Sequence, residues 1–248
     1  MQRVDQIETV RILDCDFARL TLNATVAQVF ELIRKDERGY LCTVNVAILM
    51  MMRKDNELRR FIESAFATVA DGAPIVWASS GRLPERVTGV DLVHDLSIEA
   101  AKTDTGIYLL GATEEIVHEV AERLRHSIPS LHIAGISDGY FNDNETDRII
   151  EDINASGAKI LIVAMGVPRQ ERFIASNWQA LNVNLAIGVG GSFDVLAGRR
   201  KRAPKFLQVA GLEWAFRLAQ EPRRLFLRYL TTNCQFIYLQ IRDSLRAR

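Results

Sequence analysis

The sequence has few residues of the kinds that build disulfide or metal sites: three cysteines and four histidines among 248 residues. The cysteines have no CxxC spacing, so we expect buried free thiols in a reducing compartment rather than a disulfide framework. No histidine lies at metal-ligand spacing from another histidine or a cysteine, and we interpret all four as surface or packing residues. The residues concerned are Cys15, Cys42, Cys234, His94, His118, His126 and His132.

Long hydrophobic runs are also absent. The longest apolar run, residues 44–52, is interrupted by Asn45 and is far shorter than the roughly 18 apolar residues of a membrane span. Residues 1–14 contain no apolar segment of the kind found in signal peptides. We therefore expect a cytoplasmic protein whose membrane contacts, if it makes any, are peripheral.

Neither a P-loop nor a GxSxG nucleophile motif occurs in the chain. One acidic motif, Asp14-Cys15-Asp16, has the DxD pattern with which many sugar transferases hold a metal–nucleotide pair. It lies in a predicted N-terminal hairpin around residues 13–17, away from the main sheet predicted below. We interpret it as a turn with two solvated carboxylates, and we predict no metal site and no cofactor.

The net charge of zero conceals an uneven distribution of charge along the chain. Residues 199–248 contain twelve Lys or Arg and three Asp or Glu, so this tail carries +9 and residues 1–198 carry −9. A basic tail on an acidic body favours an anionic partner for the tail, such as lipid headgroups, nucleic acid or phosphates.

Short apolar segments alternate with helical patterns up to about residue 198, and this rhythm is typical of βαβ units. We predict an α/β fold: a Rossmann-like, mostly parallel sheet over residues 1–198 with helices on both faces, followed by a helical appendage over 199–248. The predicted strands are 40–46, 67–70, 106–111, 131–136, 159–165 and 184–189. The predicted helices are 25–35 (with Thr25 and Gln28 as a capping box), 56–66 (capped by Asn56), 74–80, 91–102, 114–127, 144–155, 168–178, 206–219, 222–231 and 233–246.

Ligands of such sheets bind beyond the carboxyl ends of the strands, so the loops there are the candidate site. The glycines and the acid of the segment 188–194 follow the last strand, where backbone N–H groups and a helix start favour phosphate. Asp71-Gly72 follows the strand 67–70, and Asp71 is either a turn residue or a general base for a hydroxyl. The candidate residues of the glycine segment are Gly188, Gly190, Gly191 and Asp194.

Ten short segments carry a further signal through their order. They are Thr43-Val-Asn45, Ala70-Asp71-Gly72, Glu85-Arg-Val-Thr-Gly-Val-Asp91, Tyr108-Leu-Leu-Gly111, Gly139-Tyr-Phe141, Gly166-Val-Pro-Arg-Gln-Glu171, Gly188-Val-Gly-Gly-Ser-Phe-Asp-Val-Leu-Ala-Gly198, Arg202-Ala-Pro204, Leu212-Glu-Trp214 and Glu221-Pro-Arg-Arg-Leu225. In this order they resemble the WecG/TagA/CpsF glycosyltransferases, glycosyltransferase family 26, across roughly residues 40–230. The chain departs from the family at Val44, Val46 and Arg169, where the family commonly has Pro, Pro and Lys.

The resemblance implies inverting transfer of an N-acetylmannosamine-type sugar or a related hexose from a UDP-sugar to a polyprenyl-diphosphate-linked acceptor. Products of this kind are surface polysaccharides, teichoic acid linkage units and exopolysaccharides. By the same resemblance, Asp71 matches the catalytic base, and Thr43 and Asn45 match polar residues of its pocket. Arg86 matches a residue near the diphosphate, and Gln170 and Gly111 match substrate-binding positions.

The tail has a chemistry of its own. Arg217, Arg224 and Arg228 recur at spacings of seven and four, and the same segment contains the aromatic residues Trp214, Phe216, Phe226 and Tyr229. Basic and aromatic amphipathic segments are typical of proteins that lie on anionic membranes. We therefore expect the protein on the inner face of the cell membrane, with these arginines directed to the membrane or the acceptor.

Two other classes stay open from the sequence alone. A nucleotide-binding α/β oxidoreductase is compatible with the sheet and the glycine segment, although a first-strand GxGxxG is missing. A non-catalytic nucleic-acid-binding protein is compatible with the basic tail, although no recognised nucleic-acid module is present and we expect no nucleic acid partner. A homo-oligomer is also compatible with the sequence.

Overall fold

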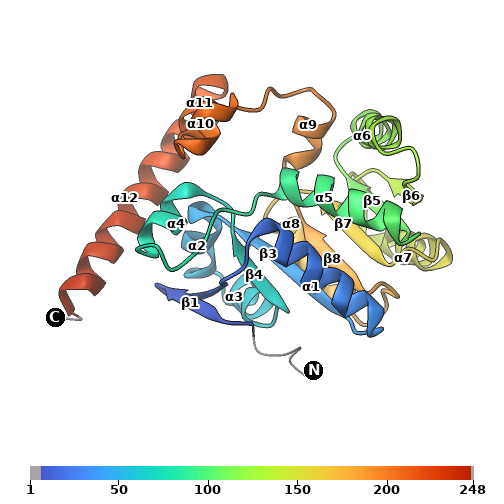
Figure 1. Ribbon diagram of the computed structural model, residues 1–248, viewed down its shortest axis with the longest axis horizontal. Coiled ribbons are helices and arrows are strands. Elements are labelled where there is room, and N and C mark those ends of the chain that lie inside the picture. Colours follow the sequence, from blue (N-terminus) through green and yellow to red (C-terminus); the bar gives the residue numbers. More distant parts are fainter. Residues whose placement is uncertain (1–6, 247–248) are drawn as a thin grey trace.

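A six-stranded parallel sheet forms the centre of the molecule (Figure 1). The computed structural model describes residues 7–246, except the side chains at positions 224, 228, 244 and 246. The strand order is β4-β3-β8-β7-β5-β6, and every neighbouring pair is parallel. The strands are β3 (Gly39–Val44), β4 (Ala67–Ala70), β5 (Ile107–Gly111), β6 (Ile133–Ser137), β7 (Ile160–Ala164) and β8 (Leu185–Gly188).

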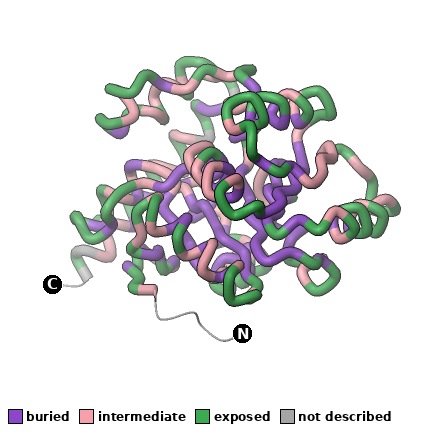
Figure 2. The backbone as a smooth tube through the Cα atoms, turned by 45° about the vertical axis from the view of Figure 1, so that its right-hand side comes forward, coloured by how far each residue is buried: buried purple, intermediate pink, exposed green. Residues whose placement is uncertain are grey.

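Helices cover both faces of this sheet, and the predicted Rossmann-like α/β class is confirmed. One apolar cluster joins the sheet to α1 (Leu22–Arg34), α5 (Gly89–Lys102), α6 (Glu114–Ser127) and α9 (Ser192–Leu196). The other cluster joins the opposite face to α2 (Val46–Met52), α3 (Asn56–Glu63), α7 (Thr146–Ala155) and α8 (Arg169–Asn177). All strands of the sheet except the edge strand β6 are buried along their whole length, as Figure 2 shows by colour. The remaining helices are α4 (Ala73–Ala78), the short 3-10 turn η1 (Asp143–Glu145), α10 (Lys205–Val209), α11 (Glu213–Gln220) and α12 (Pro222–Arg246).

Three predicted boundaries are wrong, each because a neighbouring side chain makes the helix cap. Thr21 accepts from the backbone N–H of Ala24 and begins α1, whereas Thr25 is buried inside the helix. Asp55, not Asn56, caps α3. The strand predicted over 40–46 ends at Val44, and Asn45 caps a helix, α2, that the apolar run after it concealed.

The predicted N-terminal hairpin is confirmed as the antiparallel pair β1 (Thr9–Ile12) and β2 (Cys15–Ala18). Its acids are engaged in ion pairs: Asp14 with Arg53, and Asp16 with Arg11 at 2.9 Å. These acids line a groove beside the sheet edge at β4, distinct from the pocket described below. Asp14 therefore lies in the turn of the hairpin and Asp16 in its second strand, and both predicted solvated carboxylates are held in ion pairs.

The tail forms three helices, and both predictions about their division are wrong. The helix predicted over 206–219 is two helices, α10 and α11, separated at Gly211, where φ is +73°. The two segments predicted over 222–231 and 233–246 are one continuous helix, α12. No glycine or proline interrupts residues 223–246, so helical hydrogen bonding continues through Thr231 and Thr232. Figure 1 shows α12 running along one side of the molecule beside α2 and α4. Cys234 on this helix is exposed, contrary to the prediction, whereas Cys15 and Cys42 are buried.

α12 shares its apolar side chains with the core. Phe236 and Leu239 are 4% and 5% exposed and belong to the same cluster as the residues of α2. The boundary at residue 198 stays a prediction about folding units, but the core face of α2 is covered only when α12 is in place.

Phe236→Ala is expected to lower the free energy of unfolding by about 3–5 kcal/mol, because it leaves a cavity under a buried ring. The matched control is Ile237→Ala, since this neighbouring side chain is 56% exposed and its truncation should change stability by less than about 0.5 kcal/mol. Urea unfolding of both variants measures the difference. Equal effects would show that α12 does not dock on the core in solution.

Candidate active site

A pocket lies at the carboxyl ends of β3 and β4, where two predicted residues meet. Val44 and Ala70 are paired in the parallel register, so Asn45 and Asp71 follow side by side. The backbone N–H of Asp71 donates to the carbonyl of Val44 at 2.9 Å and continues the ladder by one residue. Both side chains line the pocket, which agrees with the rule that parallel sheets bind ligands at this edge.

The local sequence explains how these two residues are presented. The side-chain oxygen of Asn45 accepts from the N–H groups of Ala47 and Ile48 at 3.0 and 3.1 Å, which holds the residue as the cap of α2. Its amide nitrogen has no hydrogen bond within the described residues and is left as a donor for a ligand. Gly72 has φ = +153°, a conformation that favours glycine, and it turns the chain from β4 into α4 directly after Asp71.

The opposite side of the pocket is built by the tail. Arg86, in the loop before α5, donates to Glu213 of α11 at 2.5 Å, and both side chains are less than one fifth exposed. Arg217, one helical turn after Glu213, reaches the pocket from the exposed side of α11. The remaining lining residues come from α2, α4, α5 and its cap, α9, α11 and the turn before it, and α12: Val46, Ala47, Ala73, Pro74, Thr88, Gly89, Val90, Ser192, Gly211, Trp214, Tyr229, Thr232 and Asn233.

Burial makes Asp71 an unusual carboxylic acid. It raises the pKa of Asp71 to about 6, opposed by Arg217 and Arg86 and assisted by Glu213 and Asp91. A carboxyl group with a pKa near 6 is ionised at neutral pH and is still basic enough to accept a proton from a hydroxyl. The pocket therefore holds one group suited to general-base chemistry, with arginines that suit an anionic ligand.

A network of ion pairs holds the tail against this pocket. Arg202 donates to Asp91 at 2.6 Å, and its Nε lies 3.9 Å from Glu213. Burial alone would raise the pKa of Asp91, but the hydrogen bonds from Arg202 and Thr88 hold it below its usual value. Glu213 thus lies between two arginines, one from the sheet side and one from the tail.

Thr43 and Gln170, both predicted to contact substrate, lie inside the protein beside the pocket. The Thr43 hydroxyl donates to the carbonyl of Gly188 at 3.1 Å and joins β3 to β8. Gln170 is 2% exposed, and its oxygen accepts from the N–H groups of Gly166 and Gly190 at 3.2 and 2.9 Å. Its nitrogen donates to the carboxyl group of Glu171. This group is buried, and burial raises its pKa to about 7. Gln170 therefore holds two glycine loops together.

The glycine segment is positioned by this amide. A Cβ atom on Gly188 would lie 2.5 Å from the Gln170 nitrogen, so only glycine lets the amide approach the end of β8. The Gly190 N–H, predicted as a phosphate donor, is used by Gln170. Gly191 precedes α9, Asp194 lies 3.8 Å from Arg200, and Gly111 ends β5. Neither Asp194 nor any of the predicted glycines lines the Asp71 pocket.

The three tail arginines lie on two helices rather than one. Arg217 belongs to α11 and Arg224 and Arg228 to α12, so the three residues do not lie on one helix. The side chains of Arg224 and Arg228 lie outside the described part of the structure. Arg217 is the one of the three whose position beside Asp71 is established.

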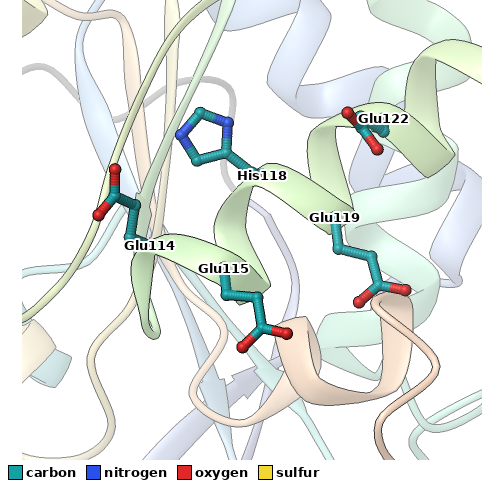
Figure 3. A pocket seen from close by; sticks show the side chains of 5 residues that line it. All are labelled: Glu114, Glu115, His118, Glu119 and Glu122. Carbon is teal, nitrogen blue, oxygen red and sulfur yellow. The ribbon is translucent and has the colours of Figure 1, made fainter.

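A second pocket, lined by acidic residues of α6, has no chemistry comparable to that of the Asp71 pocket. Figure 3 shows Glu114, Glu115, His118, Glu119 and Glu122 spread along one helix with their side chains diverging. Glu115 and Glu119 form ion pairs with Arg199. Within residues 7–246, no group of three or more His, Cys, Asp or Glu side chains is arranged to hold a metal ion. The four histidines are exposed, as predicted.

Apart from Arg217, sequence reasoning assigned no site role to the residues that the tail contributes to the pocket. Glu213 is one of three acids among twelve bases in the tail, and this contrast was the available signal for a specific ion pair. Tyr229, Thr232 and Asn233 carried no motif, because their role appears only when α12 is placed beside α2.

The fold and the pocket together define a class of protein. A parallel α/β sheet with a carboxyl group opposite arginines at its carboxyl edge has groups that suit a substrate with a hydroxyl and an anionic group. A model of the glycosyl transferase WecG/TagA/CpsF family matches residues 10–248. The chain belongs to this family and is a glycosyltransferase.

Gln170→Ala is expected to lower the free energy of unfolding by about 2 kcal/mol or more, because it leaves two backbone N–H groups and a buried carboxyl without their partner. Gln179→Ala, at an exposed glutamine just after the same helix, is the control. Thermal and urea unfolding measure both. A stable Gln170→Ala variant with impaired transfer would instead place this amide on the substrate.

Proposed function

We propose that the protein is an inverting glycosyltransferase that moves an N-acetylmannosamine-type sugar, or a related hexose, from a UDP-sugar to a polyprenyl-diphosphate-linked acceptor. The observation that carries this proposal is the placement of Asp71, with its raised pKa, in one pocket with Arg86 and Arg217. Family membership supplies the reaction class, and the pocket supplies groups for both halves of the reaction.

The acceptor half of the reaction uses Asp71. Its carboxylate takes the proton from an acceptor hydroxyl as the hydroxyl oxygen forms a bond to the anomeric carbon of the donor sugar. The bond from that carbon to the UDP oxygen breaks on the opposite side, and its electron pair leaves with UDP. A single displacement of this kind inverts the configuration at the anomeric carbon.

The donor half of the reaction depends on positively charged side chains. Arg86 and Arg217 stabilise the negative charge that develops on the departing diphosphate, and Arg suits such a group through paired hydrogen bonds. Arg86 becomes available when the diphosphate replaces Glu213 as its partner. Because arginines fill this role at the pocket, we propose a reaction that needs no metal ion and no cofactor.

The pocket encloses about 110 Å³ in this conformation. Sites for ligands of drug size usually enclose about 300–1,000 Å³. The enclosed space therefore suits the reacting sugar, while the nucleotide extends outward or the tail helices shift to admit it.

None of the helices within residues 7–246 is both long and apolar enough to cross a bilayer. The solvent face of α12 nevertheless carries an apolar stripe at spacings of four, seven, four and four, formed by Phe226, Leu230, Ile237, Ile241 and Leu245, each at least 50% exposed. Exposed apolar stripes beside positive charge are typical of helices that lie in a membrane interface. We propose that α12 holds the enzyme on the inner face of the cell membrane, where its lipid-linked acceptor resides.

Asp71→Asn is expected to reduce transfer by about 10²–10⁴-fold, because the amide cannot accept the proton. In the wild type, kcat/KM should rise with pH through about 6 and level off above it, as Asp71 ionises. The melting temperature of the variant at neutral pH should match or exceed that of the wild type, since the ionised form of an acid with a raised pKa destabilises the fold above that pKa. Near-normal turnover in the variant would reduce Asp71 to a turn residue.

A screen of UDP-sugars with a short-chain lipid-diphosphate-linked sugar tests the reaction itself. Transfer from one UDP-sugar, with the product anomer inverted by NMR, is the expected result. The same assay with EDTA should give an unchanged rate. Activity that falls in EDTA and returns with Mg²⁺ or Mn²⁺ would contradict the metal-independent reaction, and a retained anomer would contradict single displacement.

Ile237→Ser combined with Ile241→Ser should reduce co-sedimentation with anionic phospholipid vesicles by at least about tenfold, because each isoleucine loses its apolar burial in the interface. Thr231→Ser on the same helix, outside the stripe, is the matched control. High salt should weaken binding of all forms. Equal sedimentation of the double variant and the control would remove α12 from membrane binding.

A further inference from the structure

The core-facing side of α12 changes character where it passes the pocket. Leu225, Phe236 and Leu239, at the two ends of this side, are buried apolar residues. Between them, Tyr229, Thr232 and Asn233 occupy the same side at spacings of three and four and line the pocket. A polar window is thus set into an otherwise apolar helix face.

At the window the pocket is lined by hydroxyl and amide groups, whereas the two ends of the same side of α12 are apolar and buried. The window coincides with the Asp71 pocket, and Asn45 from β3 reaches the same space with its amide. Hydroxyl and carboxamide groups both donate and accept hydrogen bonds, which is the chemistry that recognises sugar hydroxyl and acetamido groups.

We propose that Thr232 and Asn233 bind the sugar of the lipid-linked acceptor and orient its hydroxyl toward Asp71. The inference rests on the proposed function and adds the residues that select the acceptor. α12 is the one tail helix that carries both the pocket window and the exposed apolar stripe, on different sides of the same cylinder. An acceptor whose lipid lies in the membrane beside the stripe has its sugar within reach of the window.

The donor is served by a different part of the pocket. The arginines that suit its diphosphate come from the loop before α5 and from α11, and not from the described side chains of α12. Changes in the window should therefore alter recognition of the acceptor and leave the nucleotide site intact.

The test uses Thr232→Val and Asn233→Leu, which keep the branching of each side chain and remove its hydrogen-bonding groups. Thr231→Val is the matched control, because the neighbouring Thr231 is exposed and its hydroxyl donates to the backbone of Leu227. Initial rates are measured with UDP-N-acetylmannosamine and a short-chain lipid-diphosphate-linked N-acetylhexosamine. UDP binding is measured by calorimetry, and melting temperatures confirm that each variant is folded.

We expect each pocket variant to raise the acceptor KM by roughly 3- to 10-fold, the effect of losing one hydrogen bond to a ligand. The dissociation constant for UDP and the KM for the donor should stay within about twofold of wild type. An unchanged acceptor KM in both variants, an equal rise in Thr231→Val, or a shift confined to the donor would overturn the proposal. If Asn233→Leu fails to fold, the isosteric Thr232→Val decides.

Failure of the proposed function is distinguishable from failure of this inference. A wild-type chain that transfers from no UDP-sugar would refute the reaction, and binding of the same lipid-diphosphate sugar is then measured directly by calorimetry. Weaker binding in Thr232→Val than in Thr231→Val would still support the acceptor site. Equal binding would overturn it.

Discussion

The ion pair between Arg86 and Glu213 joins the two parts of the molecule that make the pocket. Arg86 belongs to the sheet domain and Glu213 to the tail, and their side chains are 19% and 16% exposed. Charges at this depth are weakly solvated, so removing Glu213 leaves Arg86 without its ion-pair partner, and breaking such a pair typically costs several kcal/mol. The pocket around Asp71 therefore depends on a docked tail, and a diphosphate that competes for Arg86 would alter how the tail is held.

The same dependence explains why Asp71 has an unusual pKa. Residues of α11 and α12 line the pocket that Asp71 also lines, and burial is the largest cause of its raised pKa. With less burial, the pKa of Asp71 would be lower and its carboxylate would be a weaker base. Tail docking thus contributes to the chemistry through burial as well as through the side chains it supplies.

The sheet was predictable from the sequence because each strand is a short, continuous apolar run bounded by turn residues. The errors occurred where tertiary contacts decide between local alternatives: Asn45 reads as part of a strand but caps α2, and Thr25 reads as a cap but is buried in α1. In the pocket, Asn45, Asp71, Arg86 and Arg217 could be named in advance, since motif order identified three of them and charge spacing the fourth. The window of α12 could not, because its residues acquire a role only through the docking of a helix distant in sequence.

Resemblance to a family identifies positions but not the contacts made there, and Gln170 illustrates the difference. Its motif position suggests a group that contacts substrate, whereas its buried amide holds the loops of Gly166 and Gly190 in register with β8. A side chain in this place affects transfer through the shape of the glycine segment, so its influence on catalysis and its influence on stability have one physical origin. Asp71 is the opposite case: its burial weakens the fold when the carboxyl is ionised and supplies the basicity that the reaction needs. Gln170, which supports the site, therefore stabilises the fold, whereas ionised Asp71, which reacts in the site, destabilises it.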